Sequence, residues 1–205
     1  MEGYTTIKQY ASYEYEDRKS VFIGEAMPVS CEADALNFIE SVKHRYPDAR
    51  HHVYAYVLRE NSIMRFSDDR EPQGTAGMPV LDSIRKNGCT DTVIVVTRYF
   101  GGTLLGTGGL VRAYSAAATG ALMGAEIINY DIYTRLNIAL TYSDYQRVTP
   151  ILSEFSFRTE DTVYEADVVV VGRLPSTKYE ELCEKVTEAT SSRAKIEFLE
   201  EKFDF

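Results

Sequence analysis

The sequence is short of the features that build disulfide-bonded, cysteine-ligated and membrane-spanning proteins. It has no tryptophan and only three cysteines, Cys31, Cys89 and Cys183, which are far apart in the chain and odd in number. This arrangement argues against a disulfide framework and a cysteine-based metal site, and it suits a reducing compartment. No apolar run approaches the roughly 20 residues that cross a bilayer, and no basic segment near the N-terminus precedes an apolar one. We therefore expect a cytoplasmic protein without a signal peptide or a membrane partner.

Basic charge is also in short supply. The chain has 22 lysine and arginine residues against 31 acidic ones, which gives a net charge of −9. That balance argues against non-specific binding of naked DNA, because such binders show a basic footprint. The charge is uneven, with 10 basic and 7 acidic residues in 43–112 but 8 basic and 14 acidic residues in 136–205. A phosphate-bearing partner can therefore still dock on the mildly basic middle of the chain.

Apolar periodicity predicts an α+β fold, beginning with a β-sheet and helices in residues 1–132. We expect strands at 4–17, 20–28, 51–59, 62–66 and 91–97. We expect helices before Pro47, from Thr75 or Gly77, and over 110–124. The run 91–97 is β-branched and is the most apolar in the chain, which is typical of a buried central strand.

The pattern restarts near residues 130–135, where we place a domain boundary. Residues 133–205 form the second predicted domain. Between 136 and 203 the expected order is strand, helix, strand, strand, helix, strand, which is the ferredoxin-like arrangement.

A glycine-rich segment follows the predicted central strand. Its glycines are Gly101, Gly102, Gly106, Gly108 and Gly109. Glycine lets a backbone approach a ligand closely, and the N–H groups at a helix start attract anions. Arg98 before the segment and Arg112 after it can fork onto phosphate oxygens. The segment lacks the ending of a P-loop and the third glycine of a dinucleotide fingerprint. It therefore indicates either an anion cradle or a tight turn with close helix–sheet packing.

Three carboxylates, Asp68, Asp69 and Glu71, lie within four residues in a polar loop. Such groups can bind Mg²⁺ or act as a general base, although the spacing does not match an EF-hand. The alternative is that they cap turns and the next helix. Thr75 and Gly77 begin that helix, and its start would form a polar groove with the glycine-rich segment. This groove requires both helix starts to emerge on the same side of the sheet.

Aromatic residues and a histidine complete the candidate site. Tyr99, Phe100 and Tyr114 flank the glycine-rich segment as exposed rings in this interpretation, and rings beside arginines suit both RNA-base stacking and core packing. His51 precedes His52 on a strand, so their side chains point to opposite faces, and one can reach the groove as an accessory group. The sequence has no zinc spacing and no nucleophile elbow, so we expect neither a metal nor a cofactor.

Four longer motifs resemble those of a known family. They are FIG at 22–24, PDARH at 47–51, SDDREPQGTAG at 67–77 and TRYFGGTLLGTGGLVRAY at 97–114. Together they resemble the YigZ/IMPACT family along essentially the whole chain. One position departs from the pattern, because the family usually has glycine where this chain has Arg70. An arginine there either disfavours a left-handed turn or indicates that the turn does not need one, and it adds a cation beside the acidic loop.

The resemblance implies a fold and a class of function. It implies an N-terminal domain with the fold of domain IV of elongation factor G. The ferredoxin-like C-terminal domain would be similar to domain V of that factor. Eukaryotic relatives regulate translation by engaging a ribosome-associated activator of a stress kinase. Ribosome or nucleic-acid binding has been inferred from fold for bacterial members.

Three hypotheses follow, and binding is favoured over catalysis. The first is a translation-associated protein that contacts RNA or a ribosome-associated protein, with Arg98 and Arg112 neutralising phosphate. The second is a metal-dependent hydrolase of a small phosphorylated or peptidic substrate that uses the carboxylates of 68–71. The third is a protein-interaction module that uses the same groove. The oligomeric state is left open.

Overall fold

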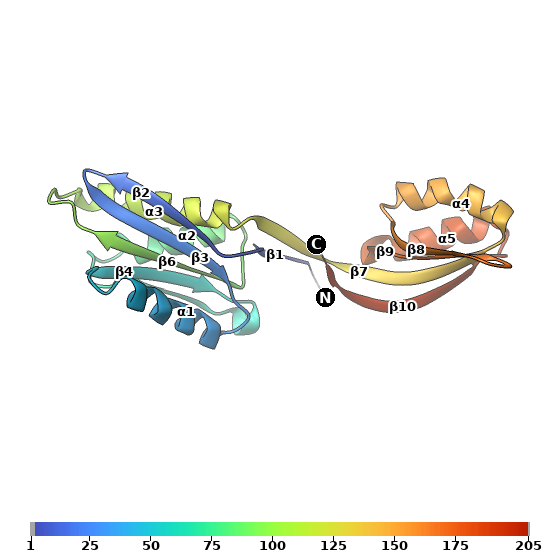
Figure 1. Ribbon diagram of the computed structural model, residues 1–205, viewed down its shortest axis with the longest axis horizontal. Helices are drawn as coiled ribbons and strands as arrows, with labels where there is room; N and C mark the ends of the chain where they lie inside the picture. Colours follow the sequence, from blue (N-terminus) through green and yellow to red (C-terminus); the bar gives the residue numbers. More distant parts are fainter. Residues whose placement is uncertain (1–2, 205) are drawn as a thin grey trace. The chain divides into compact units, whose positions relative to one another are not determined.

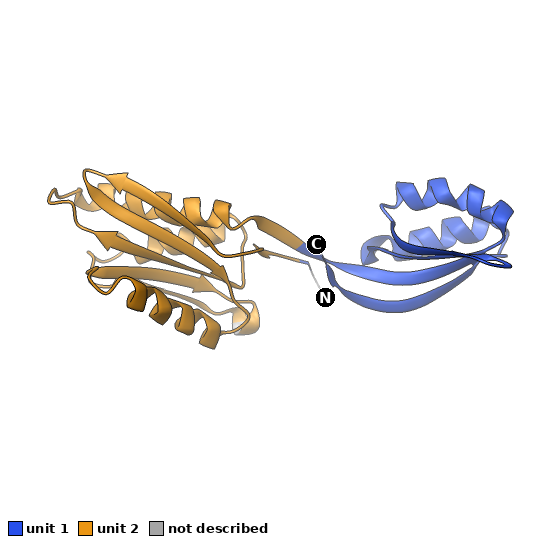
Figure 2. Cartoon of the chain, in the orientation of Figure 1, with its two compact units in different colours: residues 1–3, 130–205 blue, residues 4–129 orange. Residues whose placement is uncertain are grey.

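The computed structural model describes residues 3–204, and the chain forms two compact units (Figure 1). Figure 2 shows these units, of which one comprises Tyr4–Asn129 and the other continues from Tyr130. The expected α+β class with two domains is confirmed. The domain boundary at 132/133 stays a prediction, because strand β7 (Ile127–Leu140) continues from one unit into the other without a break.

The N-terminal unit is built on a five-stranded antiparallel sheet with the strand order β2-β3-β6-β4-β5. The strands are β2 (Ala11–Asp17), β3 (Ser20–Pro28), β4 (His51–Val57), β5 (Met64–Ser67) and β6 (Thr92–Tyr99). The central strand is β6, and seven of its eight residues are buried. The prediction of a buried central strand from its apolar run is therefore confirmed.

Helices cover both faces of this sheet (Figure 1). Helices α2 (Gly77–Lys86) and α3 (Gly106–Gly124) pack on one face, and α1 (Glu32–Arg45) packs on the other. Alternate side chains of β6 point to the two faces of the sheet, and Ile94 and Val96 lie in the core under α2 and α3. Strands with both faces buried read as continuous apolar runs, which explains the sequence of β6.

The starts of α2 and α3 lie at the same end of the sheet. Strands β5 and β6 are each antiparallel to β4, so they run in the same direction. Each of them is followed by a helix that packs on the same face. The predicted groove required both helix starts to emerge on the same side of the sheet, and they do.

Two expectations about this unit are wrong. Residues 4–17 form two strands, and the first, β1 (Tyr4–Ile7), pairs with β7 in the other sheet instead of joining β2. Helix α3 begins at Gly106, four residues before the expected start at Leu110. Glycine weakens a helix, but the buried side of α3 stabilises it, and first-turn N–H groups need no acceptor within the helix.

The C-terminal unit has the ferredoxin-like order, as predicted. After β7 come α4 (Tyr142–Glu154), β8 (Arg158–Tyr164), β9 (Val168–Pro175), α5 (Tyr179–Ala189) and β10 (Lys195–Asp204). Its four strands are all antiparallel and have the order β10-β7-β9-β8. Short 3-10 turns, η1 (Glu60–Ser62) and η2 (Ser176–Lys178), complete the elements. Among the described helices, none is long and apolar enough to cross a membrane.

Candidate binding surface at the start of helix α3

A buried polar cluster joins the loop before α2 to the strand and helix that follow. Glu71 Oε1 accepts hydrogen bonds from Arg98 Nη1 at 2.6 Å and from the Tyr114 hydroxyl at 2.8 Å. All three side chains are buried. Burial, and then the Glu71 carboxylate, raise the pKa of the Tyr114 phenol, so it stays a hydrogen-bond donor at neutral pH. The cluster therefore ties the acidic loop, β6 and α3 into one unit.

Asp68 caps helix α2. Its Oδ1 accepts hydrogen bonds from the N–H groups of Ala76 at 3.0 Å and Gly77 at 2.8 Å, and its Oδ2 accepts from Gly74 at 2.8 Å. Gly77 begins the helix and Ala76 is its N-cap, and the first amides of a helix lack acceptors within it, whereas Gly74 lies in the turn before it. Thr75 joins the turn by donating its hydroxyl to the Pro72 carbonyl at 2.6 Å. The geometry supports the capping alternative for Asp68.

Asp69 anchors the start of strand β4. Its carboxylate accepts the His52 N–H at 2.7 Å, and its carbonyl oxygen lies 2.8 Å from His51 Nδ1. A carbonyl oxygen only accepts, so His51 carries its proton on Nδ1. The other ring nitrogen, Nε2, lies 3.9 Å from Glu71 Oε1. His51 therefore faces the buried cluster.

Arg70 adopts a left-handed backbone with φ of +67°. This is the position where the resembling family usually has glycine. Its Nη2 donates to the Arg50 carbonyl at 3.0 Å, and its Nε lies 3.6 Å from Asp69 Oδ1. The turn has thus kept a glycine-like conformation, and the arginine adopts it at a steric cost.

The three carboxylates of 68–71 do not share a metal site. Each of them is bonded to a different set of protein donors. Across residues 3–204 no group of three or more histidine, cysteine or acidic side chains is arranged to hold a metal ion. The geometry supports the interpretation that these carboxylates organise the loop, and it offers the hydrolase hypothesis no ligand set.

Most of the predicted glycines meet demands of the fold. A Cβ on Gly77 would lie 2.7 Å from the Ser67 carbonyl oxygen, and one on Gly101 would collide with the backbone of Lys19. Gly109 would bring a Cβ to 2.9 Å from that of Leu105. The positive φ angles of Gly102, +83°, and Gly106, +72°, are unfavourable for other residues. Tight turns and close packing explain these five positions.

Gly108 is different, because neither space nor backbone conformation requires a glycine there. It is exposed in the first turn of α3, its φ is not positive, and a Cβ would meet only Arg112 Nη1, at 3.7 Å. Arg112 itself is exposed in the second turn, and it makes no hydrogen bond or ion pair with the described part of the chain. These two residues remain available to a ligand.

The arginines and the three aromatic residues predicted for the site differ in how far the structure exposes them. Arg98 is buried against Glu71, so it supports the site from beneath and does not face a phosphate. The expectation that Tyr114 is exposed is wrong, because its ring lies in the core, 5.1 Å from that of Phe22. Phe100 is exposed, and its ring centroid lies 5.7 Å from the Arg98 guanidinium carbon. Tyr99 is only half-buried.

The turn between β2 and β3 contributes residues that the sequence analysis missed. Arg18 Nη1 donates to the Leu104 carbonyl at 3.3 Å, and the Gly101 N–H donates to Ser20 Oγ at 3.0 Å. Lys19 lies in the same turn, exposed and without a partner among the described residues. The sequence held a signal, since two adjacent basic residues stand between two predicted strands. Only the fold brings that turn beside the loop before α3.

We name the exposed residues Phe100, Gly106, Gly108 and Arg112 the α3 surface. No side chain of the described residues caps the start of α3, and its first turn has no acidic residue. The first N–H groups of a helix are unsatisfied within it and carry a partial positive charge. With Arg112 one turn further on, this surface is suited to an anion.

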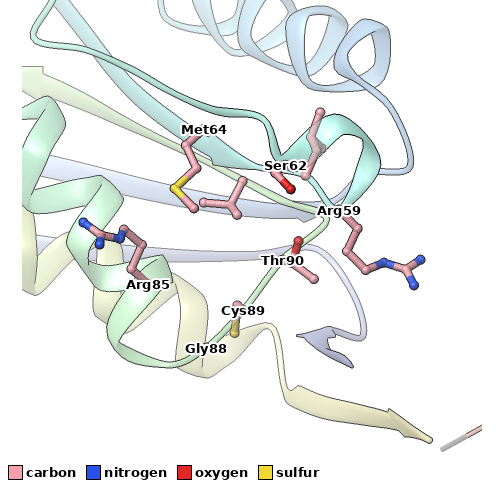
Figure 3. A pocket seen from close by; sticks show the side chains of 9 residues that line it. Arg59, Ser62, Met64, Arg85, Gly88, Cys89 and Thr90 are labelled. Carbon is pink, nitrogen blue, oxygen red and sulfur yellow. The ribbon is translucent and has the colours of Figure 1, made fainter. Parts of the chain in front are cut away.

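A separate pocket of about 470 Å³ lies at the C-terminal end of α2. It is lined by Val57, Leu58, Arg59, Ser62, Met64, Arg85, Gly88, Cys89 and Thr90. Figure 3 shows the Arg59 and Arg85 guanidinium groups pointing in opposite directions, away from the centre. Burial raises the pKa of the Cys89 thiol to about 11, so it is not a ready nucleophile. The pocket offers no converging charged groups.

We expect Glu71→Gln to destabilise the N-terminal unit by about 3 kcal/mol, because it leaves the buried Arg98 charge uncompensated. Urea unfolding followed by circular dichroism measures the loss. Glu126→Gln is the matched control, since it removes an exposed partner of Lys8 and should cost at most about 1 kcal/mol. Equal losses in the two variants would contradict the role of the cluster.

The raised pKa of Tyr114 predicts a loss of stability at alkaline pH. In the unfolded chain this phenol ionises near its ordinary value of 10.0, but in the folded protein it keeps its proton to higher pH. The stabilisation is therefore complete below about pH 10 and is lost as the pH rises further. In Tyr114→Phe the free energy of unfolding should fall less steeply above pH 10. Parallel curves for the two proteins would show that Tyr114 is not linked to folding.

Comparison with known proteins places this architecture in a family. Residues 18–122 match the Impact N-terminal domain, and residues 138–193 match a domain of unknown function, DUF1949. The chain is 32% identical to the IMPACT family member YvyE of Bacillus subtilis, over 96% of this chain and 91% of that protein. It is 34% identical to the family member YigZ of Escherichia coli, over 90% of this chain and 91% of that one.

A solved structure supports the same assignment. The crystal structure of a hypothetical protein matches with a TM-score of 0.61 and 31% identity, covering 98% of each chain. The two domain matches together cover most of the sequence, and both relatives are named as IMPACT family members. The chain is a member of the YigZ/IMPACT family.

Proposed function

We propose that the chain is a cytoplasmic, translation-associated protein that binds ribosomal RNA through the α3 surface. Membership of the IMPACT family, which is related to the regulation of translation, supports the general function. The observation that carries the RNA contact is the exposed start of α3 beside Arg112, where neither the helix start nor the arginine has a side-chain partner among the described residues. Phosphate groups bind at such helix starts.

The contrast between α2 and α3 strengthens the proposal. Both helices begin at the same end of the sheet, and α2 is satisfied by the Asp68 carboxylate. At the start of α3 no carboxylate among residues 3–204 takes the equivalent place. An RNA phosphate at α3 would make the contacts that Asp68 makes at α2. Phe100, exposed next to the loop, supplies a ring on which a base can stack.

The distribution of charge agrees with an RNA contact on this unit. Residues 4–129 hold 13 basic and 15 acidic residues, whereas residues 130–205 hold 9 basic and 15 acidic ones. Residues 4–129 therefore carry −2 of the net charge and residues 130–205 carry −6, and Glu2 supplies the remaining −1. Lys19 and Arg18, in the turn beside the loop, add local positive charge. Local charge of this kind steers a phosphate-bearing partner even on an acidic protein.

Salt dependence tests the Arg112 contact. Purified ribosomal subunits are titrated with wild type and Arg112→Gln over a range of salt concentrations. The variant should bind more weakly, and the slope of log affinity against log salt should shrink by about 0.7, the value for one contact to a single strand. Lys86→Gln is the control, because Lys86 is exposed, without a partner among the described residues, and lies at the far end of α2.

Three results would contradict the proposal in different ways. An unchanged slope in Arg112→Gln would remove that side chain from the contact. Equal effects of the Arg112 and Lys86 variants would indicate non-specific attraction. Retention of the protein on ribosomes after nuclease treatment would favour a protein partner at this surface.

Gly108→Ala separates binding from stability. Alanine favours a helix over glycine by up to about 1 kcal/mol, and there is room for its methyl group. We therefore expect the variant to be at least as stable as wild type in thermal unfolding. Its affinity for ribosomal subunits should nevertheless fall, because the methyl group keeps a phosphate from the backbone. A stable variant with unchanged affinity would show that the ligand does not approach Gly108.

A further inference from the structure

Three tyrosines gather on the C-terminal unit, where no predicted site lies. Tyr142 and Tyr145 come from the first turn of α4, and Tyr164 ends strand β8. The rings of Tyr142 and Tyr164 are stacked, with centroids 6.5 Å apart and planes 29° apart. Tyr145 meets Tyr164 edge-on, at 6.0 Å and 88°. The fold thus assembles one aromatic surface from two segments of the chain.

Two of these rings are exposed, Tyr145 is half-buried, and all three are held in place. Tyr142 is 52% exposed and Tyr164 is 57% exposed. The Tyr142 hydroxyl donates to the Glu165 carbonyl at 3.0 Å, and the Tyr145 and Tyr164 hydroxyls lie 3.2 Å apart. Ring positions held in this way lose little conformational entropy when a partner binds. Large exposed aromatic groups of this kind characterise contact surfaces.

The surroundings of the rings are acidic. Glu165 and Asp167 are exposed among the three residues that follow Tyr164. Their carboxylates form no ion pair with any described residue. Two basic side chains of this unit pair with Asp144, and Arg193 does so through two hydrogen bonds of 3.0 and 2.7 Å. Arg147 also lies 3.9 Å from an oxygen of Asp144.

We propose that this tyrosine surface, made of Tyr142, Tyr145, Tyr164, Glu165 and Asp167, binds an arginine-rich segment of a partner protein. A guanidinium group is attracted to the face of a tyrosine ring, and it forms paired hydrogen bonds with a carboxylate. The surface offers tyrosine ring faces, and two exposed acidic residues lie among the three residues that follow Tyr164. The same carboxylates repel RNA phosphate, so this site is distinct from the α3 surface and does not rest on the RNA proposal.

The test uses the full chain and three labelled peptides. These are short peptides of glycine alternating with arginine, with lysine or with glutamate, titrated by fluorescence anisotropy at low salt. The arginine peptide should bind best and the glutamate peptide should not bind. Tyr142→Leu and Tyr164→Leu should each raise the Kd of the arginine peptide by about two- to fivefold, the loss expected for one exposed cation–π contact.

Matched controls separate the surface from general acidity. Phe198→Leu removes a ring that is also 52% exposed, on β10, and should leave the Kd unchanged. The double variant Glu165→Gln/Asp167→Asn keeps every tyrosine and should weaken binding more than Glu184→Gln/Glu188→Gln, which removes the same charge from exposed positions of α5. Failure of the arginine peptide to bind would overturn the proposal, as would equal effects of the surface and control variants.

Discussion

The hydrogen-bonded contact of Glu71 with Arg98 and Tyr114 is the interaction on which the N-terminal unit depends. It buries a charge pair, and each partner would be costly to leave alone. Because its members come from the loop before α2, from β6 and from α3, the contact fixes where α3 begins relative to the sheet. The residues outside this contact, Gly108 and Arg112, are consequently presented at a defined place. Within the same motifs, some residues hold the fold together and their neighbours are exposed to a ligand.

Much of the fold follows from the sequence, because periodicity reports burial. The apolar run of β6 and the alternation in the C-terminal unit predicted a central strand and the ferredoxin-like order, and the structure confirms both. The early start of α3 escaped prediction because burial outweighs the low helix propensity of Gly106 and Gly108. The separation of β1 from β2 escaped as well, since strand pairing between distant segments leaves no local pattern.

The sequence predicted which segment holds the candidate site, but not which role each of its residues plays. Sequence placed Asp68, Asp69 and Glu71 together, yet their spacing could not tell a metal site from three separate caps and pairs. Likewise Arg98 and Arg112 look equivalent in the sequence, although one is buried and the other is exposed. Burial and hydrogen-bond direction depend on tertiary packing, and these decided the roles. The two surfaces that result have opposite chemistry, one suited to phosphate and the other to cations.

Photochemical cross-linking tests the central claim, contact between RNA and the α3 surface, most directly. The full chain would be irradiated in the presence of ribosomes, digested, and mapped by mass spectrometry for nucleotide adducts. The account predicts adducts in residues 99–112, at Phe100 or Tyr99, and their loss when Arg112 is replaced. Adducts confined to the tyrosine surface of the C-terminal unit, or a complete absence of adducts, would contradict it.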